Sequence, residues 1–252
     1  MREEKIYNME QMEKPYLSII IPAYNEEKRI GKTLLAINEY LTKQDYSYEI
    51  LVVDGGSSDK TIEIIKKFQK SIENLRFIIR KEEFGKGYVV REGILEARGE
   101  FRLFTDADNS TPIDQIEKFW PYFQKGYDIV IGSRALKESE IKIRQPWFRE
   151  MPGRLSNILI QIIAVSGIKD TQCGFKCFTA KVAQDIFKRS VINRWGFDIE
   201  ILAIGRMLGY KIKEVPVVWI NDPNSKVSWK DYLTTLEDLF MIKWNLIKRK
   251  YS

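Results

Sequence analysis

Short apolar runs alternate with amphipathic segments along the first 135 residues, and this alternation constrains the fold more than any other feature of the chain. Several runs are apolar at successive positions, as in strands buried on both faces. The expected strands are 17–22, 48–54, 75–80, 100–106 and 127–134. The segments between them have the spacing of amphipathic helices, at 28–42, 59–72, 87–98 and 113–125. Such alternation predicts an α/β fold, with a mostly parallel, doubly wound sheet and flanking helices.

The pattern changes after residue 134. A basic segment at 137–154 precedes an apolar helix expected at 155–166, and a further strand is expected at 211–219. Since no linker or repeat interrupts the chain, we expect one continuous domain. Its predicted parts are a polar N-terminal segment (1–16), the domain itself (17–228) and a C-terminal amphipathic helix (229–252).

Composition excludes several kinds of chemistry. The chain has no histidine, which excludes Ser/His and Cys/His catalysis and His-ligated metals. The two cysteines, Cys173 and Cys177, are too few for a disulfide framework, so we interpret them as reduced and structural. The net charge of +6 permits nucleic acid, phosphorylated ligands or an acidic membrane surface as partners.

The sequence predicts no membrane-spanning helix. Residues 1–16 are polar and charged, unlike a signal peptide. The strongest apolar run, 158–165, is much shorter than the ~20 residues that a spanning helix needs.

Polar motifs follow three of the predicted strands. They read "PAYNEE" from Pro22, "DGGSSD" from Asp54 and "DADNS" from Asp106. Ligands of parallel α/β sheets bind beyond the carboxyl ends of the strands, so these motifs should meet at one rim. The chain lacks the glycine-rich loops of dinucleotide-binding and P-loop proteins, so a bound diphosphate would need side-chain cations or a metal.

Asp106 and Asp108 form a candidate metal site. Residues two apart in an extended segment lie on one face, and paired carboxylates suit Mg²⁺ or Mn²⁺. The alternative is a solvated turn that binds no metal.

The motifs as an ordered set resemble a known family. "IIIPAYNEE", "VVDGGSSDKT", "GKG" with Arg91, "FTDAD" and "GSR" resemble the inverting GT-A (Rossmann-like) glycosyltransferases of family 2. "DTQCGFK", "RWGFDIE" and "SK" are similar to the dolichyl-phosphate β-glucosyltransferases and related polyprenyl-phosphate enzymes. The "VINRW" segment lacks the Gln of the processive polysaccharide synthases.

This resemblance implies an activity and its parts. A hexose, with glucose expected from these enzymes, would pass from a UDP-sugar to a dolichyl or undecaprenyl phosphate with inversion, assisted by Mg²⁺ or Mn²⁺. Residues 17–135 would form the donor half and 136–228 the acceptor half. The open alternative is a UDP- or GDP-sugar transferase acting on a hydroxyl of a polysaccharide or protein. A rival of another class is a non-catalytic binder of nucleotide sugars or nucleic acid, which gives no reason for the paired aspartates.

The resemblance also implies site residues. Metal ligands would be Asp106 and Asp108, and the nucleotide-sugar site would include Pro22, Ala23, Tyr24, Glu26, Asp54, Lys86, Asp106, Ala107 and Lys226. The acceptor phosphate would meet Arg134, Arg149 and Arg154. Those placed in the reaction itself would be Asp108, Arg134, Arg149 and Asp170, the last as a base or a sugar-positioning group. Ser110 departs from mannosyl relatives, which often have a Gln ligand there.

A lipid acceptor implies a membrane surface. The segments 155–166 and 229–252 are candidates to lie on an anionic interface, which predicts peripheral association with the cytoplasmic face of a membrane. Alternatively they pack on the core or on a second subunit, so a homo-oligomer is possible. No nucleic-acid partner is expected.

Overall fold

The computed structural model describes residues 14–81, 84–143, 156–221 and 229–252, with side chains left out for 229–232. A seven-stranded sheet forms its centre, and all of its neighbouring strands run parallel except those that flank β7. In order across the sheet the strands are β3 (Leu75–Ile79), β2 (Tyr48–Asp54), β1 (Leu17–Ala23), β4 (Phe101–Thr105), β7 (Phe175–Thr179), β5 (Ile129–Ser133) and β8 (Ile212–Pro216).

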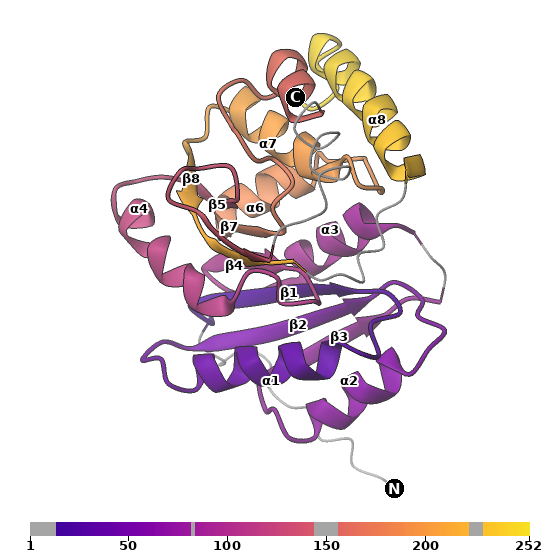
Figure 1. The fold of residues 1–252 in the computed structure, drawn as a ribbon, viewed down its shortest axis with the longest axis vertical. Helices are drawn as coiled ribbons and strands as arrows, with labels where there is room; N and C mark the ends of the chain where they lie inside the picture. Colours follow the sequence, from indigo (N-terminus) through magenta and orange to yellow (C-terminus); the bar gives the residue numbers. More distant parts are fainter. Residues whose placement is uncertain (1–13, 82–83, 144–155, 222–228) are drawn as a thin grey trace, which may run out of the picture.

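Helices cover both faces of the sheet (Figure 1). One face carries α1 (Ile30–Leu41), α2 (Thr61–Gln69), a 3₁₀ helix η1 (Ile113–Lys118) and α4 (Trp120–Gln124). The other carries α3 (Lys86–Glu96), a helix at 156–163, α6 (Ala180–Phe187), α7 (Phe197–Met207) and α8 (Trp229–Ile247). Successive side chains of β1 point to opposite faces of the sheet. Leu17, Ile19 and Ile21 therefore belong to one core cluster and Ile20 to the other.

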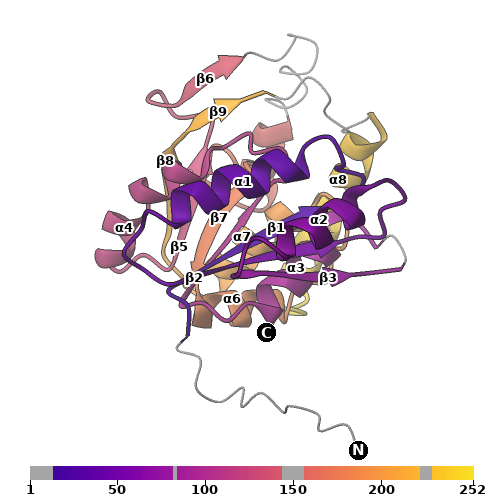
Figure 2. The same ribbon diagram turned by 90° about the horizontal axis from the view of Figure 1, so that it is seen from below.

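Five predicted strands are confirmed to within two residues at each end, and two predicted elements were wrong in detail. The segment 113–125 is not one helix but η1 followed by α4, because Pro121 has no N–H to continue the hydrogen-bond ladder. The predicted strand 211–219 divides after Pro216 into β8 and β9 (Val218–Ile220). Strand β9 pairs in parallel with β6 (Glu140–Ile143), and Figure 2 shows this ribbon standing apart from the main sheet.

Strand β7 was not predicted, and it decides how the two halves of the chain meet. It runs antiparallel between β4 and β5, with Phe175 opposite Thr105. The "DTQCGFK" motif that leads into β7 is therefore brought beside the aspartates that follow β4.

The strand order creates a switch point between β1 and β4. The chain proceeds from β1 through β2 to β3 on one side, and β4 lies on the other side of β1. Pairing of β1 with β4 ends at Ile20 and Phe104, whereas its pairing with β2 continues to Ala23 and Asp54. Pro22, which has no N–H, lies just beyond the last β4 pair. Ligands of such sheets bind at this position.

The described part of the chain contains no helix long and apolar enough to cross a membrane.

Candidate functional site

Most of the predicted site residues lie at the carboxyl edge of the sheet. Asp106 and Asp108 follow β4, Asp54 ends β2, residues 23–26 follow or end β1, and Lys86 begins α3. Arg134 follows β5 and is paired with Asp170. The predicted residues Arg149, Arg154 and Lys226 lie outside the described residues.

A lysine neutralises the first aspartate of the pair. Lys86 Nζ lies 2.6 Å from Asp106 Oδ1 and 5.1 Å from the centre of the Trp195 ring. Burial opposes the charge of this lysine, but Asp106 and Asp198 outweigh that effect and raise the pKa of Lys86. The ammonium is therefore charged at neutral pH, with an apolar ring beside it.

The surroundings of the second aspartate, Asp108, disfavour its charged form. Burial and the nearby Asp106 carboxylate raise the pKa of Asp108, although its Oδ1 accepts the Ser110 N–H at 2.9 Å. The residue between the aspartates fixes the turn, because the Ala107 carbonyl accepts a 2.7 Å hydrogen bond from the Thr33 hydroxyl of α1. Asn109 completes this turn with a left-handed φ of 54°.

These residues fit a divalent cation shared with a ligand. Within the described ranges no three His, Cys, Asp or Glu side chains cluster as a metal cage. Two carboxylates that repel each other are stabilised by a cation, and Mg²⁺ or Mn²⁺ commonly fills its other positions with water and phosphate oxygens. The donor set therefore suits a metal that arrives with a phosphorylated ligand, and its occupant stays a prediction.

Two connected loops build the rim where β1 and β2 end. The Asp54 carboxylate is fully buried and accepts the Gly56 and Ser57 N–H groups at 3.0 and 2.9 Å and the Ser57 hydroxyl at 2.5 Å. Asn25 N–H donates to that same hydroxyl at 2.8 Å, which ties the β1 loop to the β2 loop. Asp54 thus shapes the loop, and its predicted reading of uracil stays a prediction.

Tyr24 and Glu26 lie beside these loops. Tyr24 is 38% exposed and so is not a core aromatic. Glu26 accepts two hydrogen bonds from Arg29, at 2.6 and 2.7 Å. Both side chains remain candidates for ligand contact.

Arg134 and Asp170 form a bidentate pair beside the end of β5. Arg134 donates to Asp170 from its backbone N–H at 2.8 Å, from Nε at 2.7 Å and from one Nη at 2.8 Å. Burial favours the neutral acid, but the charge and hydrogen bonds of Arg134 outweigh it and lower the pKa of Asp170. The guanidinium also lies 5.4 Å from the Trp219 ring centre, which fixes its other face.

A buried ion pair beneath the aspartates was not identified from the sequence. Lys176 of β7 is completely buried, and its Nζ donates to Asp198 Oδ1 at 2.5 Å and to the Cys173 carbonyl at 2.6 Å. Its register partner is Phe104, two residues before Asp106. A lysine inside the apolar run "FKCF" is the signal that could have revealed it.

Both cysteines behave as predicted. They are free and buried, and burial raises the pKa of Cys173 to about 12. Its thiol is therefore neutral at physiological pH, which does not suit a nucleophile.

Glu200 of α7 is a buried helix charge. Its carboxylate is fully buried and accepts the N–H groups of Val191 and Ile192 and the hydroxyl of Tyr251. It is a structural anchor for the segment that precedes α7.

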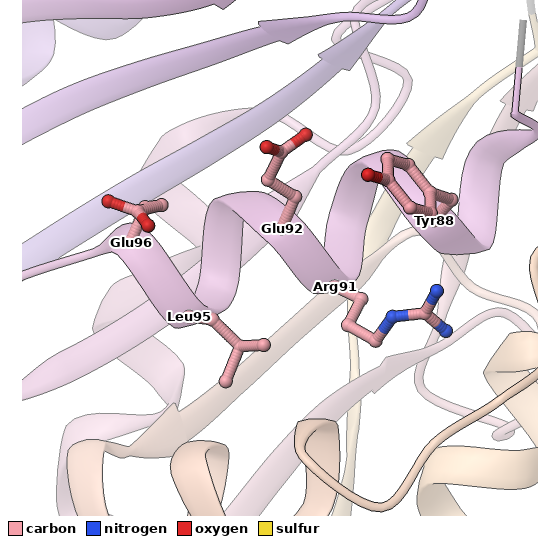
Figure 3. Close-up of a pocket in the computed structure, with 5 residues that line it drawn as sticks. All are labelled: Tyr88, Arg91, Glu92, Leu95 and Glu96. Carbon is pink, nitrogen blue, oxygen red and sulfur yellow. The ribbon is translucent and has the colours of Figure 1, made fainter.

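A shallow pocket of about 220 Å³ lies along α3, away from these residues. Figure 3 shows its lining residues Tyr88, Arg91, Glu92, Leu95 and Glu96 spaced along that helix. Arg91, which the motif comparison singled out, donates to the Ser190 carbonyl at 3.2 Å and to Asn193 Oδ1 at 2.6 Å. It therefore fastens α3 to the segment before α7.

Known proteins agree with this fold. Residues 18–187 match the model of the family described as glycosyl transferase family 2. The chain is similar to a dolichyl-phosphate beta-glucosyltransferase of Trichomonas vaginalis, with 35% identity over 94% of this chain and 77% of the relative. It is also similar to the dolichyl-phosphate beta-glucosyltransferase of Homo sapiens, with 34% identity over 90% of this chain and 74% of that enzyme.

Solved structures show the same architecture at low identity. Glucosyl-3-phosphoglycerate synthase from Mycobacterium tuberculosis, in complex with phosphoglyceric acid, matches with a TM-score of 0.70 and 16% identity, over 91% of this chain and 80% of that one. The expected α/β fold of GT-A type, with a mostly parallel sheet, is thereby confirmed.

Gly174 gives a direct test of the geometry around Asp106. A methyl group added at Gly174 would lie 2.0 Å from Asp106 Oδ2, so Gly174→Ala must displace that carboxylate. We expect the dissociation constant of UDP with Mn²⁺ to rise at least about tenfold, the scale for losing a hydrogen bond to a charged group. Calorimetry measures it, with circular dichroism to verify folding.

Gly126→Ala is the matched control, because its added methyl meets no atom within 4 Å. Its left-handed φ of 77° costs some stability but leaves the rim unchanged. Unaltered UDP affinity in Gly174→Ala would contradict the role assigned to Asp106.

Proposed function

The chain belongs to glycosyl transferase family 2, and on that premise we propose that it transfers glucose from UDP-glucose to a dolichyl or related polyprenyl phosphate, with inversion. The enzyme class, a glycosyltransferase, follows from the family and its relatives. The donor and the acceptor are inferred from those relatives and from the chemistry of the rim.

The observation that carries the proposal is the Arg134–Asp170 pair. A hydroxyl acceptor needs a general base to remove its proton. Asp170 is a poor base, because Arg134 occupies both of its oxygens and lowers its pKa. A lipid monophosphate needs no base, since its second pKa is about 6 and it is mostly a dianion at neutral pH.

Arg134 supplies the complementary charge for such an acceptor. Asp170 raises the pKa of this arginine despite burial, so the guanidinium keeps its charge at every working pH. Asp170 accepts from two of the five N–H donors of the guanidinium, which leaves the other three to meet phosphate oxygens. In this proposal Asp170 orients Arg134, and Arg134 holds the acceptor phosphate, together with the predicted Arg149 and Arg154.

The donor side must stabilise the departing nucleotide. When bound, a divalent cation held by Asp106 and Asp108 would supply charge stabilisation to the leaving diphosphate. Lys86, 2.6 Å from Asp106, would add a second positive charge at the same place. A structure of the mycobacterial synthase with Mn²⁺, UDP and glucosyl-3-phosphoglycerate, at a TM-score of 0.62, supports this use of the fold. Lys226 remains a predicted contact of the diphosphate.

An exposed apolar surface suits a lipid acceptor. Its side chains lie on the helix at 156–163 and on α8, two helices that contribute residues to one core cluster. Its large exposed side chains are Ile158, Leu159, Ile162, Leu233, Leu236, Phe240, Met241, Trp244 and Ile247. Four basic residues accompany it (Lys243, Lys248, Arg249 and Lys250), against a single exposed acid, Glu237, among the described side chains from 233 onward.

This helical surface therefore combines exposed aromatic and aliphatic groups with positive charge. Such a combination fits the headgroup region of an anionic bilayer. We propose that it holds the enzyme on the membrane that contains the acceptor.

A transfer assay tests donor, acceptor and metal together. With radiolabelled UDP-glucose and dolichyl phosphate, we expect a glucolipid with a β linkage, formed with Mn²⁺ and abolished by excess EDTA. Asp108→Asn should lower the rate at least about a hundredfold, the scale for losing a main electrostatic element. Labelled UDP-mannose and GDP-mannose serve as competing donors, and full activity in EDTA would exclude the metal.

The pH profile separates a phosphate nucleophile from a hydroxyl nucleophile. The lowered pKa of Asp170 keeps its carboxylate ionised from pH 5 to 8, so its titration does not change the transfer rate in that range. The rate should therefore rise through pH ~6, as the acceptor phosphate loses its second proton, and then level off. Asp170→Asn should lower the rate about tenfold or more with the same midpoint, since it disturbs only the position of Arg134. If Asp170→Asn removes the limb, Asp170 is a base and the acceptor is a hydroxyl.

Sedimentation with vesicles tests the helical surface. We expect binding to vesicles that contain phosphatidylglycerol, weaker binding at high salt, and at least about a tenfold loss in a Phe240→Ser/Ile247→Ser variant. Leu35→Ser is the control, because Leu35 is equally exposed but lies on α1, on the opposite face of the sheet. Self-association without vesicle binding would show that this surface joins two copies of the chain instead.

A further inference from the structure

The segment 190–197, between α6 and α7, forms one wall of the donor rim. It carries Trp195, whose ring centre lies 5.1 Å from Lys86 Nζ, and it leads into Phe197, 6.0 Å from the same atom. Two contacts tie it to the start of α3, since Tyr88 N–H donates to the Asn193 carbonyl at 3.2 Å and Arg91 to Asn193 Oδ1. The position of Trp195 relative to Lys86 therefore depends on how this segment is held.

Gly85 and Gly87 show how closely α3 and this segment approach. An added methyl at Gly85 would lie 2.5 Å from the Asn193 carbonyl oxygen, and one at Gly87 would lie 2.6 Å from the Ile192 carbonyl oxygen. The backbones are in direct contact around Lys86, so a shift of the segment would move the lysine as well.

Two buried carboxylates hold the backbone of the segment from its two ends. Glu200 of α7 accepts the N–H groups of Val191 and Ile192, and Tyr251 closes this contact with a 2.8 Å hydrogen bond to Glu200. At the other end, Asp238 of α8 is 1% exposed and accepts the Gly196 N–H at 3.3 Å.

Asp238 makes the more specific of the two contacts. It also accepts a 2.8 Å hydrogen bond from Arg194, which is half exposed. A methyl at Gly196 would lie 2.4 Å from Asp238 Cβ, so α8 and the segment touch with no side chain between them. Asp238 thus bonds to the residues on both sides of Trp195.

From this geometry we infer that Asp238 is a positioning residue for the donor site, although it lies on α8 and outside the matched family region. It fixes Trp195 against Lys86, and thereby directs the ammonium toward Asp106 and the donor diphosphate. The inference rests on the proposed function for the identity of the donor only.

The test compares donor and acceptor affinities in an isosteric variant. Asp238→Asn removes the charge that holds Arg194 and weakens the acceptor of the Gly196 N–H. We expect the dissociation constant of UDP-glucose with Mn²⁺ to rise about tenfold, with the acceptor KM changed less than twofold. The donor-induced change in Trp195 fluorescence, identified by its loss in Trp195→Phe, should decrease in parallel.

Glu237→Gln is the matched control. Glu237 precedes Asp238 on α8 and lies 3.6 Å from the same Arg194, but it is 70% exposed, so donor affinity should stay within twofold. Arg194→Gln removes the same ion pair by changing its more exposed partner. This variant replaces Asp238→Asn in the test if Asp238→Asn does not fold.

Two results would overturn the inference. One is unchanged donor affinity in folded Asp238→Asn and Arg194→Gln. The other is an equal loss of donor affinity, acceptor affinity and thermal stability, as a general structural role would give. Because donor binding is measured without an acceptor, failure of wild-type transfer to dolichyl phosphate would reject the proposed acceptor and leave this test intact.

Discussion

The electrostatics of Asp106 and Asp108 constrain the rest of the structure. Two carboxylates two residues apart repel each other, so burial raises the pKa of Asp108 and the Asp106 carboxylate raises it further. Two cations offset this negative charge. Lys86 Nζ lies 2.6 Å from Asp106 Oδ1, and the Arg134 guanidinium is close enough to interact electrostatically with Asp106. Positive charge that offsets the repulsion between these carboxylates is also what the proposed anionic donor and acceptor would need.

Supporting this rim requires charges inside the core. Lys176 and Asp198 form an ion pair under the aspartates, with side chains 0% and 4% exposed. Burial raises the pKa of Asp198, although Lys176 and Lys86 oppose that effect. Removing one partner of such a pair typically costs about 3–5 kcal/mol, because the other is left buried and uncompensated. The pair therefore makes the floor of the rim rigid and intolerant of change.

Helix α8 contributes side chains to the core and also to the exposed surface. Leu239 and Ile242 pack in the core cluster shared with α7, and Asp238 holds the segment that carries Trp195. Leu233, Phe240 and Ile247 are exposed on its other side. Helix α8 thus contacts the segment proposed as a wall of the donor site and also carries part of the surface proposed to meet the bilayer. The segment and the surface are therefore structurally connected.

The architecture and the position of the rim could be predicted from the amino-acid pattern alone. Successive apolar positions identified five strands of the sheet, because strands buried on both faces have no polar alternation. Polar motifs at the ends of β1, β2 and β4 then had to share one edge, which is where Asp54, Asp106 and Asp108 lie. Their order along the chain identified the family, whose model matches residues 18–187.

The contacts between these motifs could not be predicted in this way, because they depend on how distant parts of the chain pack. Strand β7 enters the sheet antiparallel and sets Gly174 against Asp106, a pairing that no local pattern encodes because register depends on distant strands. The Arg134–Asp170 pair joins residues 36 apart, and the Arg194–Asp238 pair joins residues 44 apart. The burial of Glu200 under Tyr251 is another example, since a helical position alone does not reveal what packs over it. Periodicity reports which face of an element is apolar, whereas pairing between buried charges exists only once the chain has folded.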